Sequence, residues 1–496
     1  MQIGSVDVAI IVAYIILIFG IALSANIFMR KQALLRRGPD DNAIENHYLA
    51  GKSITFWEAL LSIIATEFSA LAFLTIPTYV YFENMSYLRF VLGAFLSRAL
   101  ISAYFLPKVY GKGLTIFEAL ARGIHGYTTI TKDGLMGKKL FAFFYIIAKL
   151  IGVSVKLLGG ALLVSEFLSI PLFLAIVLIS IMTYLYIMLG GLKAVVRTDM
   201  LQASIFILGG LVAHYVVGKM SNFTWGELFT FGVQNGKFSL LNDAGIISFF
   251  YGIFAGVAYD AATHGVDQDL VQKLFGAKDI ETARKALAWS AVGSLLVNLL
   301  FLSLGVILWA YYTRHGQAVP PPEKIFSYLI ANHFPTPIKG LMIASILAAS
   351  MSTLDSSINA MSAVFWNDLM SVKKSKLFRV FINLDNFIIT TSIVIVSYLF
   401  SFIPGSVKFG LHFSYLSTAP LLAFFLCRML LEKYIKIRFT PSLIFLSFIS
   451  CYLGMGLNHF RFGFNPQLTI LWGIITTIAF MWVYSKISEL FKQKES

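Results

Sequence analysis

The chain has 496 residues, of which 58% are hydrophobic and only 13% are charged. Soluble globular chains carry about 25% charged residues, so this composition excludes an ordinary soluble enzyme. The net charge of +14 does not indicate a nucleic-acid partner, because the Lys and Arg residues lie between apolar blocks and form no basic stretch with interleaved aromatic residues. The composition indicates an integral membrane protein surrounded by the lipid bilayer.

Hydrophobicity windows of about 19 residues predict thirteen membrane-spanning helices. The predicted spans are residues 7–28, 55–79, 86–107, 139–164, 170–189, 192–217, 245–263, 287–311, 338–362, 380–403, 408–429, 440–457 and 467–487. No linker or soluble domain separates them, so we expect residues 1–496 to form a single all-α transmembrane domain.

Basic residues are distributed unevenly among the loops between these spans. They cluster after the odd-numbered spans, for example Arg36 and Arg37 after the first and Lys373 and Lys374 after the ninth, whereas the alternate loops carry few. Because cytoplasmic loops are enriched in Lys and Arg, this asymmetry predicts a multi-pass protein of the cell membrane, with its N-terminus outside and its C-terminus in the cytoplasm.

Sequence motifs of common enzymes are missing. Gly51-Lys52-Ser53 resembles the end of a phosphate-binding loop, but such a loop needs a glycine where this chain has Asn46. There is also no His-Glu-x-x-His zinc motif and no Gly-x-Ser-x-Gly nucleophile motif. We therefore expect neither an enzyme nor a transporter driven by ATP.

Several ionisable residues lie within the predicted spans. An ionisable group at the centre of a bilayer costs about 2.5–3.5 kcal/mol on insertion scales, so such residues usually mark a transport pathway or an ion pair. The residues are Glu67, Arg98, Lys149, Lys156, Asp199, Asp260 and Asp355. Their number indicates a polar interior of the kind that transporters have.

The ninth span, residues 338–362, carries the densest group of hydroxyl side chains. Helical periodicity places four small residues on one face, namely Ala349, Ser352, Thr353 and Ser356. Hydroxyl and carbonyl oxygens without net charge are suitable ligands for a dehydrated monovalent cation such as sodium. The alternative is a close helix–helix interface, where small residues are also common.

The second span, residues 55–79, contains the polar stretch Thr66-Glu67-Phe68-Ser69 and, further on, Pro77. Proline removes a backbone donor, and the polar stretch could tolerate an unwound segment whose carbonyl groups face a cavity. Interrupted helices of this kind form the cation sites of many secondary transporters. An ordinary kinked helix is the alternative.

The sixth span, residues 192–217, follows Gly190-Gly191, which we predict to form a tight cytoplasmic turn. Asp199 lies about two turns into this helix. It could be a second cation ligand or a relay on the exit path. The alternative is a structural ion pair with Arg197 or with a neighbouring helix.

Three regions, taken together and in order, resemble the signatures of the sodium/solute symporter family. They are Gly190-Gly191 through Asp199 and Gln202, Asp267-Gln268 through Val271-Gln272-Lys273, and the helix that carries Ser352-Thr353. The resemblance implies a LeuT-type fold of about thirteen helices, with a core of two inverted five-helix repeats. These repeats would be residues 50–217 and 245–430, flanked by a peripheral first helix, residues 1–30, and two peripheral C-terminal helices, residues 440–487.

The resemblance also implies where sodium would bind. The first site would lie between the second and ninth spans and use the backbone carbonyls of Ala65, Phe68 and Ala349 with the hydroxyls of Ser352 and Thr353. Some members have a second site near the aspartate of the sixth span, which here would use Asp199, Ser352 and Ser356. Asp355 stands where relatives often have a small polar residue, so this second carboxylate could strengthen a cation site or could bind a proton.

Members of the family carry sugars, proline, pantothenate, iodide, sialic acid or monocarboxylates with sodium. The substrate contacts that we expect are Ala72, Thr75, Lys149, Lys156, Thr263 and His264. The two lysines lie about two turns apart on one face of the fourth span, which lines the substrate cavity in this family, and they favour an anionic solute. The aromatic residues that sugar carriers place before the Asp-Gln pair are replaced by residues 261–265, Ala-Ala-Thr-His-Gly.

Each of these substrate contacts has a structural alternative. The lysines could pair in the interior with Glu67 or Asp260, and His264 could be a buried, hydrogen-bonded histidine. Taken together, the sequence predicts a sodium-coupled symporter that imports a small organic solute by alternating access, with no obligate protein partner. A proton-coupled carrier of the same fold is the alternative within transport, and a channel or membrane sensor is the alternative from another class.

Overall fold

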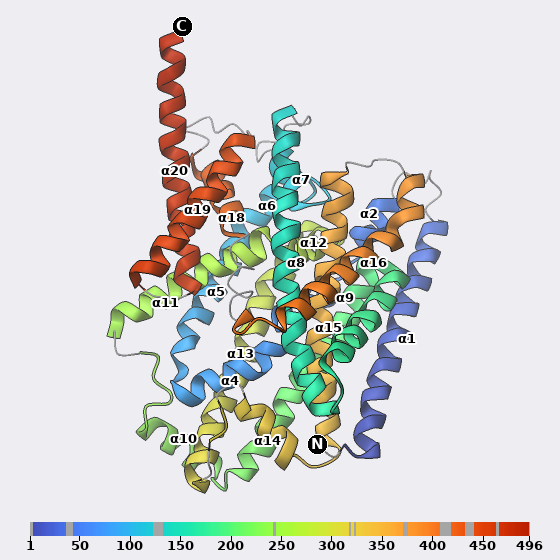
Figure 1. The fold of residues 1–496 in the computed structure, drawn as a ribbon, viewed down its shortest axis with the longest axis vertical. Coiled ribbons are helices and arrows are strands. Elements are labelled where there is room, and N and C mark those ends of the chain that lie inside the picture. Colours follow the sequence, from blue (N-terminus) through green and yellow to red (C-terminus); the bar gives the residue numbers. More distant parts are fainter. Residues whose placement is uncertain are drawn as a thin grey trace.

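The computed structural model describes residues 3–35, 43–122, 132–241, 245–316, 319–321, 324–370, 375–406, 418–431, 441–462 and 466–495. Its helices in chain order are α1 (Ser5–Leu35), α2 (Ala43–Tyr48), α3 (Phe56–Glu67), α4 (Ala70–Phe82), α5 (Leu88–Leu100), α6 (Leu106–Val109), α7 (Ile116–Arg122), α8 (Lys132–Leu168), α9 (Leu172–Met220), α10 (Trp225–Gln234), α11 (Gly245–Asp260), α12 (Gln268–Phe275), α13 (Ile280–His315), α14 (Ile325–His333), α15 (Ile338–Val364), α16 (Ser375–Phe400), α18 (Thr418–Leu431), α19 (Pro441–Phe462) and α20 (Pro466–Glu495). Three π-helical turns, Ile101–Phe105, Ala261–Gly265 and Phe365–Leu369, extend α5, α11 and α15. Figure 1 shows these helices as one elongated bundle, and the described residues contain no strand.

Many of the helices could cross a bilayer. By length and composition, eight helices of the described part of the chain meet this condition, and the bent pair α3–α4 would be a ninth. α9 has 49 residues, which as one straight helix would be about 74 Å long, more than twice the thickness of a hydrocarbon core. All thirteen predicted spans overlap a helix, and two of them overlap α9, although residues 408–417 of the eleventh lie outside the described residues. The number of spans stays a prediction.

α9 consists of two helical segments that meet at Gly191. The φ of 54° and ψ of −143° at this residue form a backbone conformation that glycine adopts and that strains other residues. A Cβ atom here would also lie 2.7 Å from the backbone oxygen of His47. The glycine pair that the sequence marks as a turn is therefore the point where the fifth and sixth predicted spans join.

α15 is the central helix of the bundle. In its most apolar stretch 94% of the residues are buried, compared with 28% in α1, which lies along the edge (Figure 1). α15 packs against α9, α8, α1 and α3. Exposed apolar side chains of α1 include Ile16, Leu17 and Ile27, as expected for a helix in contact with lipid. The hydroxyl-bearing face of α15 thus lies inside the protein.

The second predicted span is a broken helix. α3 ends at Glu67 and α4 begins at Ala70, and the two helices are bent by 63° relative to each other. The intervening residues Phe68 and Ser69 have extended backbone conformations. Pro77 lies within α4, so the polar stretch, and not the proline, marks the interruption.

Candidate functional site

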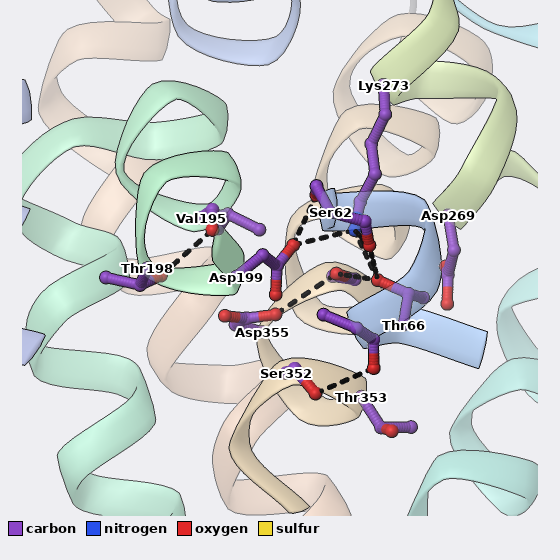
Figure 2. A network of polar contacts seen from close by, with 12 residues as sticks. Ser62, Thr66, Val195, Thr198, Asp199, Asp269, Lys273, Ser352, Thr353 and Asp355 are labelled. Atoms are coloured by element: carbon purple, nitrogen blue, oxygen red, sulfur yellow. Dashed lines mark hydrogen bonds and ion pairs between the residues drawn. The ribbon is translucent and has the colours of Figure 1, made fainter. Parts of the chain in front are cut away.

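The break between α3 and α4 faces the hydroxyl groups of α15. The Ser352 hydroxyl donates to the carbonyl of Ala65 at 3.0 Å and to that of Ala349 at 3.3 Å, and the Thr353 hydroxyl donates to Ala349 at 3.1 Å. Figure 2 shows both hydroxyl side chains beside the end of α3. Phe68 follows in the extended segment, and all five residues predicted for the first sodium site are at most 5% exposed. The fold brings these five residues together.

A second group of polar residues lies next to this break. Asp199 of α9 and Asp355 of α15 are neighbours in Figure 2. Asp355 accepts a hydrogen bond from Ser356 at 3.1 Å, and the Ser356 hydroxyl is 3.1 Å from that of Thr66 on α3. The predicted members of the second cation site therefore lie side by side.

Asp199 forms an ion pair with a lysine of a neighbouring helix. The ammonium of Lys273, on α12, is 2.8 Å from Asp199 Oδ2, and both side chains are fully buried. Arg197, which the sequence offered as an alternative partner, instead pairs with Glu58 at 3.2 Å. The structural ion pair of Asp199 is thus made with a neighbouring helix, as the second alternative predicted.

A cavity of about 200 Å³ adjoins the break. Of the predicted substrate contacts, Ala72, Thr75 and Lys156 line it, and Lys149, Thr263 and His264 do not. Lys156 is partly buried and forms no hydrogen bond or ion pair with any residue that the structure describes. The cavity wall therefore holds a lysine that is not paired with any described residue.

Arg98 connects the acidic residues of the cavity wall. Its guanidinium is 2.6 Å from Glu67 and 3.0 Å from Asp260, and it donates to the Ser290 carbonyl at 3.1 Å. Glu67 and Asp260 both line the cavity, whereas Arg98 is 1% exposed. The guanidinium thus neutralises charge just behind the cavity wall, a role that the sequence did not assign.

Lys149 is engaged elsewhere, in a charge cluster that joins α8, α12 and α15. Its ammonium is 2.8 Å from Asp267 and 2.6 Å from Asp269. Tyr145 donates to both carboxylates, and Ser357 donates to Asp269 at 2.8 Å. The predicted alternative of interior pairing is therefore right in kind but wrong in partner, because the acids are not Glu67 or Asp260. Burial raises the pKa of Asp267, but the Lys149 ammonium outweighs it and holds that pKa below its ordinary value.

Thr263, which ends the seventh predicted span, and His264, which follows it, also make structural contacts. His264 Nδ1 lies 2.8 Å from Asp260 Oδ1, and the histidine is 3% exposed. The Thr263 hydroxyl donates to the carbonyls of Tyr259 and Asp260, each at 3.2 Å. His264 is therefore the buried, hydrogen-bonded histidine that the sequence offered as its alternative.

A family model for the sodium:solute symporter family matches residues 47–434 of this chain. A sodium/sialic acid symporter of Aliivibrio fischeri is 26% identical over 347 residues, which cover 66% of this chain and 64% of that protein. One of Proteus mirabilis is 26% identical over 337 residues, covering 66% and 65%. A human sodium/iodide cotransporter is 24% identical, covering 68% and 52%. The chain thus spans less than two thirds of the length of these relatives.

Solved structures share the fold. A Na⁺-coupled sialic acid symporter in a substrate-bound outward-open state superposes with a TM-score of 0.81 at 17% identity, over 98% of both chains. A nucleobase-cation-symport family transporter superposes with a TM-score of 0.55 at 14% identity, over 87% of this chain and 92% of the other. These likenesses confirm the predicted LeuT-type membrane fold. With a family match that covers most of its length, the chain belongs to the sodium:solute symporter family.

Proposed function

We propose that this protein couples the movement of sodium to the import of a small organic anion by alternating access. The observation that carries the proposal is the hydrogen bond from Ser352 on α15 to the Ala65 carbonyl at the broken end of α3. This hydrogen bond places backbone carbonyls and hydroxyls of α3 and α15 in one buried group of neutral oxygens. Oxygen ligands of this kind suit a hard cation, and broken helices supply them in secondary transporters.

Lys156 supports the anionic solute. It is a cation on the wall of the cavity that adjoins the break, and no described residue neutralises it. A buried charge without a partner is costly, so a ligand that brings a carboxylate would be stabilised there. Two of the relatives are named as sialic acid symporters, and sialic acid is itself a carboxylic acid.

Sodium and the solute would bind next to each other, because Phe68 belongs to both the proposed sodium site and the cavity wall. If both ligands favour the same conformer, each raises the affinity for the other by the same coupling free energy. The proposed movement is a rocking of the inverted repeats, residues 50–217 and 245–430, about this site. The basic loops of the sequence would then face the cytoplasm.

The sodium site is tested with purified protein in nanodiscs, with sodium or potassium as the added cation at constant ionic strength. At ten times its Kd, sodium should raise the free energy of unfolding by about 1.4 kcal/mol. Ser352→Ala and Thr353→Ala should abolish this stabilisation because they remove two of the proposed ligands. Ser350→Ala is the matched control, since among the described residues that hydroxyl bonds only within α15, to the Ile346 carbonyl.

Sodium-specific stabilisation that persists in both variants would show that the site is misplaced. Stabilisation that follows pH at fixed sodium, with no difference between sodium and potassium, would favour the proton-coupled carrier instead.

The solute site is tested in the same assay with sodium present. Sialic acid, pyruvate and benzoate serve as carboxylate probes, and glucose serves as the neutral probe. We expect at least one carboxylate to stabilise the wild-type protein and none to stabilise Lys156→Gln, while Lys278→Gln, which changes an exposed lysine, behaves as wild type. Stabilisation by glucose alone, or a carboxylate response that survives in Lys156→Gln, would contradict an anionic solute.

A further inference from the structure

Asp199, which lies beside Asp355, already has a cation. Lys273 approaches from α12, and its ammonium lies 2.8 Å from Asp199 Oδ2 and 3.0 Å from the Ser62 carbonyl. It also hydrogen-bonds to the Thr66 hydroxyl. Figure 2 shows the side chain extended down into this group of oxygens. An ammonium has three donors, so three acceptors satisfy it completely.

The oxygens around this ammonium are of the kind that a sodium ion would need. One is a carboxylate, one a backbone carbonyl and one a hydroxyl, and they come from two helices, α3 and α9. The Ser62 hydroxyl binds the same oxygen of Asp199. The ammonium of Lys273 thus binds one of the carboxylates predicted for the second cation site, together with two oxygens of α3.

Lys273 cannot readily leave this position, because α12 is fixed at both ends. At its start, the side-chain oxygen of Gln268 accepts from the Ile116 backbone at 2.9 Å. Next to the lysine, Gln272 donates to the Tyr48 carbonyl at 2.7 Å. After its end, Ile54 donates to the Gly276 carbonyl at 3.1 Å. The side chain of Lys273 is fully buried, so the lysine is a fixed part of the protein interior.

Asp355 is held by hydroxyl groups. It accepts hydrogen bonds from the hydroxyls of Tyr186 and Ser356, and it forms no ion pair with any residue that the structure describes. A sodium ion placed between Asp355 and Asp199 would lie close to the Lys273 ammonium, and the two positive charges would repel each other.

We propose that the ammonium of Lys273 is a permanent, covalently attached cation that takes the place of a second sodium ion, so that this transporter binds one sodium ion and not two. The inference rests on the proposed sodium-coupled function, because it concerns the number of coupled ions. Lys273 then determines the stoichiometry of coupling, and with it how steeply the solute can be concentrated by a given sodium gradient.

The test counts sodium ions bound per protein molecule, with radioactive sodium alone as the probe and the purified full-length chain in nanodiscs. We expect one ion for the wild type and one for Lys273→Arg, which keeps the charge. Lys273→Gln should bind two, because the carboxylates lose their internal cation, and the double variant Lys273→Gln with Asp199→Asn should return to one.

Asp199→Asn alone keeps the proposal falsifiable if Lys273→Gln does not fold. It should still bind one sodium ion, since the first site does not include Asp199. Two ions in the wild type, a loss of one ion in Asp199→Asn, or a single ion in folded Lys273→Gln would each overturn the inference. No sodium binding in the wild type would instead overturn the proposed function, so the two failures can be told apart.

Discussion

Replacing Arg98 with methionine tests whether its guanidinium holds the cavity wall together. The substitution keeps a long apolar side chain and removes the charge. It leaves Glu67 and Asp260 without the cation that lies 2.6 Å and 3.0 Å from them. We expect the variant to be substantially less stable, because a carboxylate that is buried without its partner is much less favourable than the intact pair.

The size of the effect follows from the surroundings of the two acids. Breaking a buried ion pair by removing one partner costs about 3–5 kcal/mol. Asp260 is 2% exposed and should account for most of this, although the imidazole of His264 at 2.8 Å can offset part of it. Glu67 is 22% exposed and lines the cavity, so water can solvate it and its share is smaller. We therefore expect a loss of about 3–5 kcal/mol in total and not twice that.

The assay is equilibrium unfolding by denaturing detergent in mixed micelles, followed by circular dichroism. Arg197→Met is the matched control, because that arginine is 25% exposed and its partner Glu58 keeps Lys193 at 2.8 Å. Its loss should be below about 1 kcal/mol. The triple variant Arg98→Met, Glu67→Gln, Asp260→Asn should recover most of the stability, since no buried charge is left unpaired. An Arg98→Met protein as stable as Arg197→Met, or a triple variant no more stable than Arg98→Met, would refute this reasoning.

Two further predictions concern the parts of the fold around the site. Gly191→Ala should lower the free energy of unfolding by about 1–3 kcal/mol in the same detergent assay, because φ is 54° and the new Cβ would meet the His47 carbonyl. The control Gly20→Ala, where a Cβ meets nothing within 4 Å, should be almost neutral. Equal effects of the two substitutions would contradict this prediction. Burial raises the pKa of Glu118, but the Leu114 amide and Arg122 lower it more, so its net pKa lies below the ordinary value. The stability that the Glu118 carboxylate contributes is present above the unfolded pKa of about 4.3 and is lost as pH falls through the lower pKa of the folded state. In Glu118→Gln, the free energy of unfolding measured against pH should therefore decline less steeply on the acid side.

The sequence predicts the elements of the site better than it predicts their partners. Helical periodicity puts Ser352 and Thr353 on one face, and the polar stretch at residues 66–69 indicates an interruption, and both features are present in the fold. Each of these is a local property, determined by the residues within one or two turns. Pro77 was a weaker guide, because proline is tolerated within α4 while the chain unwinds at Phe68 and Ser69.

Contacts between helices are a different matter. Lys273 is 74 residues from Asp199 along the chain, and as a basic residue between two predicted spans it looks like any cytoplasmic loop cation. Only the return of the short helix α12 into the bundle places it beside the carboxylate. Arg98 and Lys149 were found as ionisable residues within spans, but their partners are 31 or more residues away. The sequence contains several possible acidic partners for each basic residue, and only the packing of the helices determines which of them form the ion pair.

The interruption at Phe68 and Ser69 also has an electrical polarity. α3 reaches it with its carboxyl end, where unpaired carbonyls carry partial negative charge, and α4 leaves it with its amino end, where unpaired amides carry partial positive charge. Ser69, Leu71 and Ala72 of that amino end line the cavity. The gap therefore has a negative pole on one side and a positive pole on the other. A cation and an anion bound on these two sides would attract each other directly, without any movement of the surrounding helices.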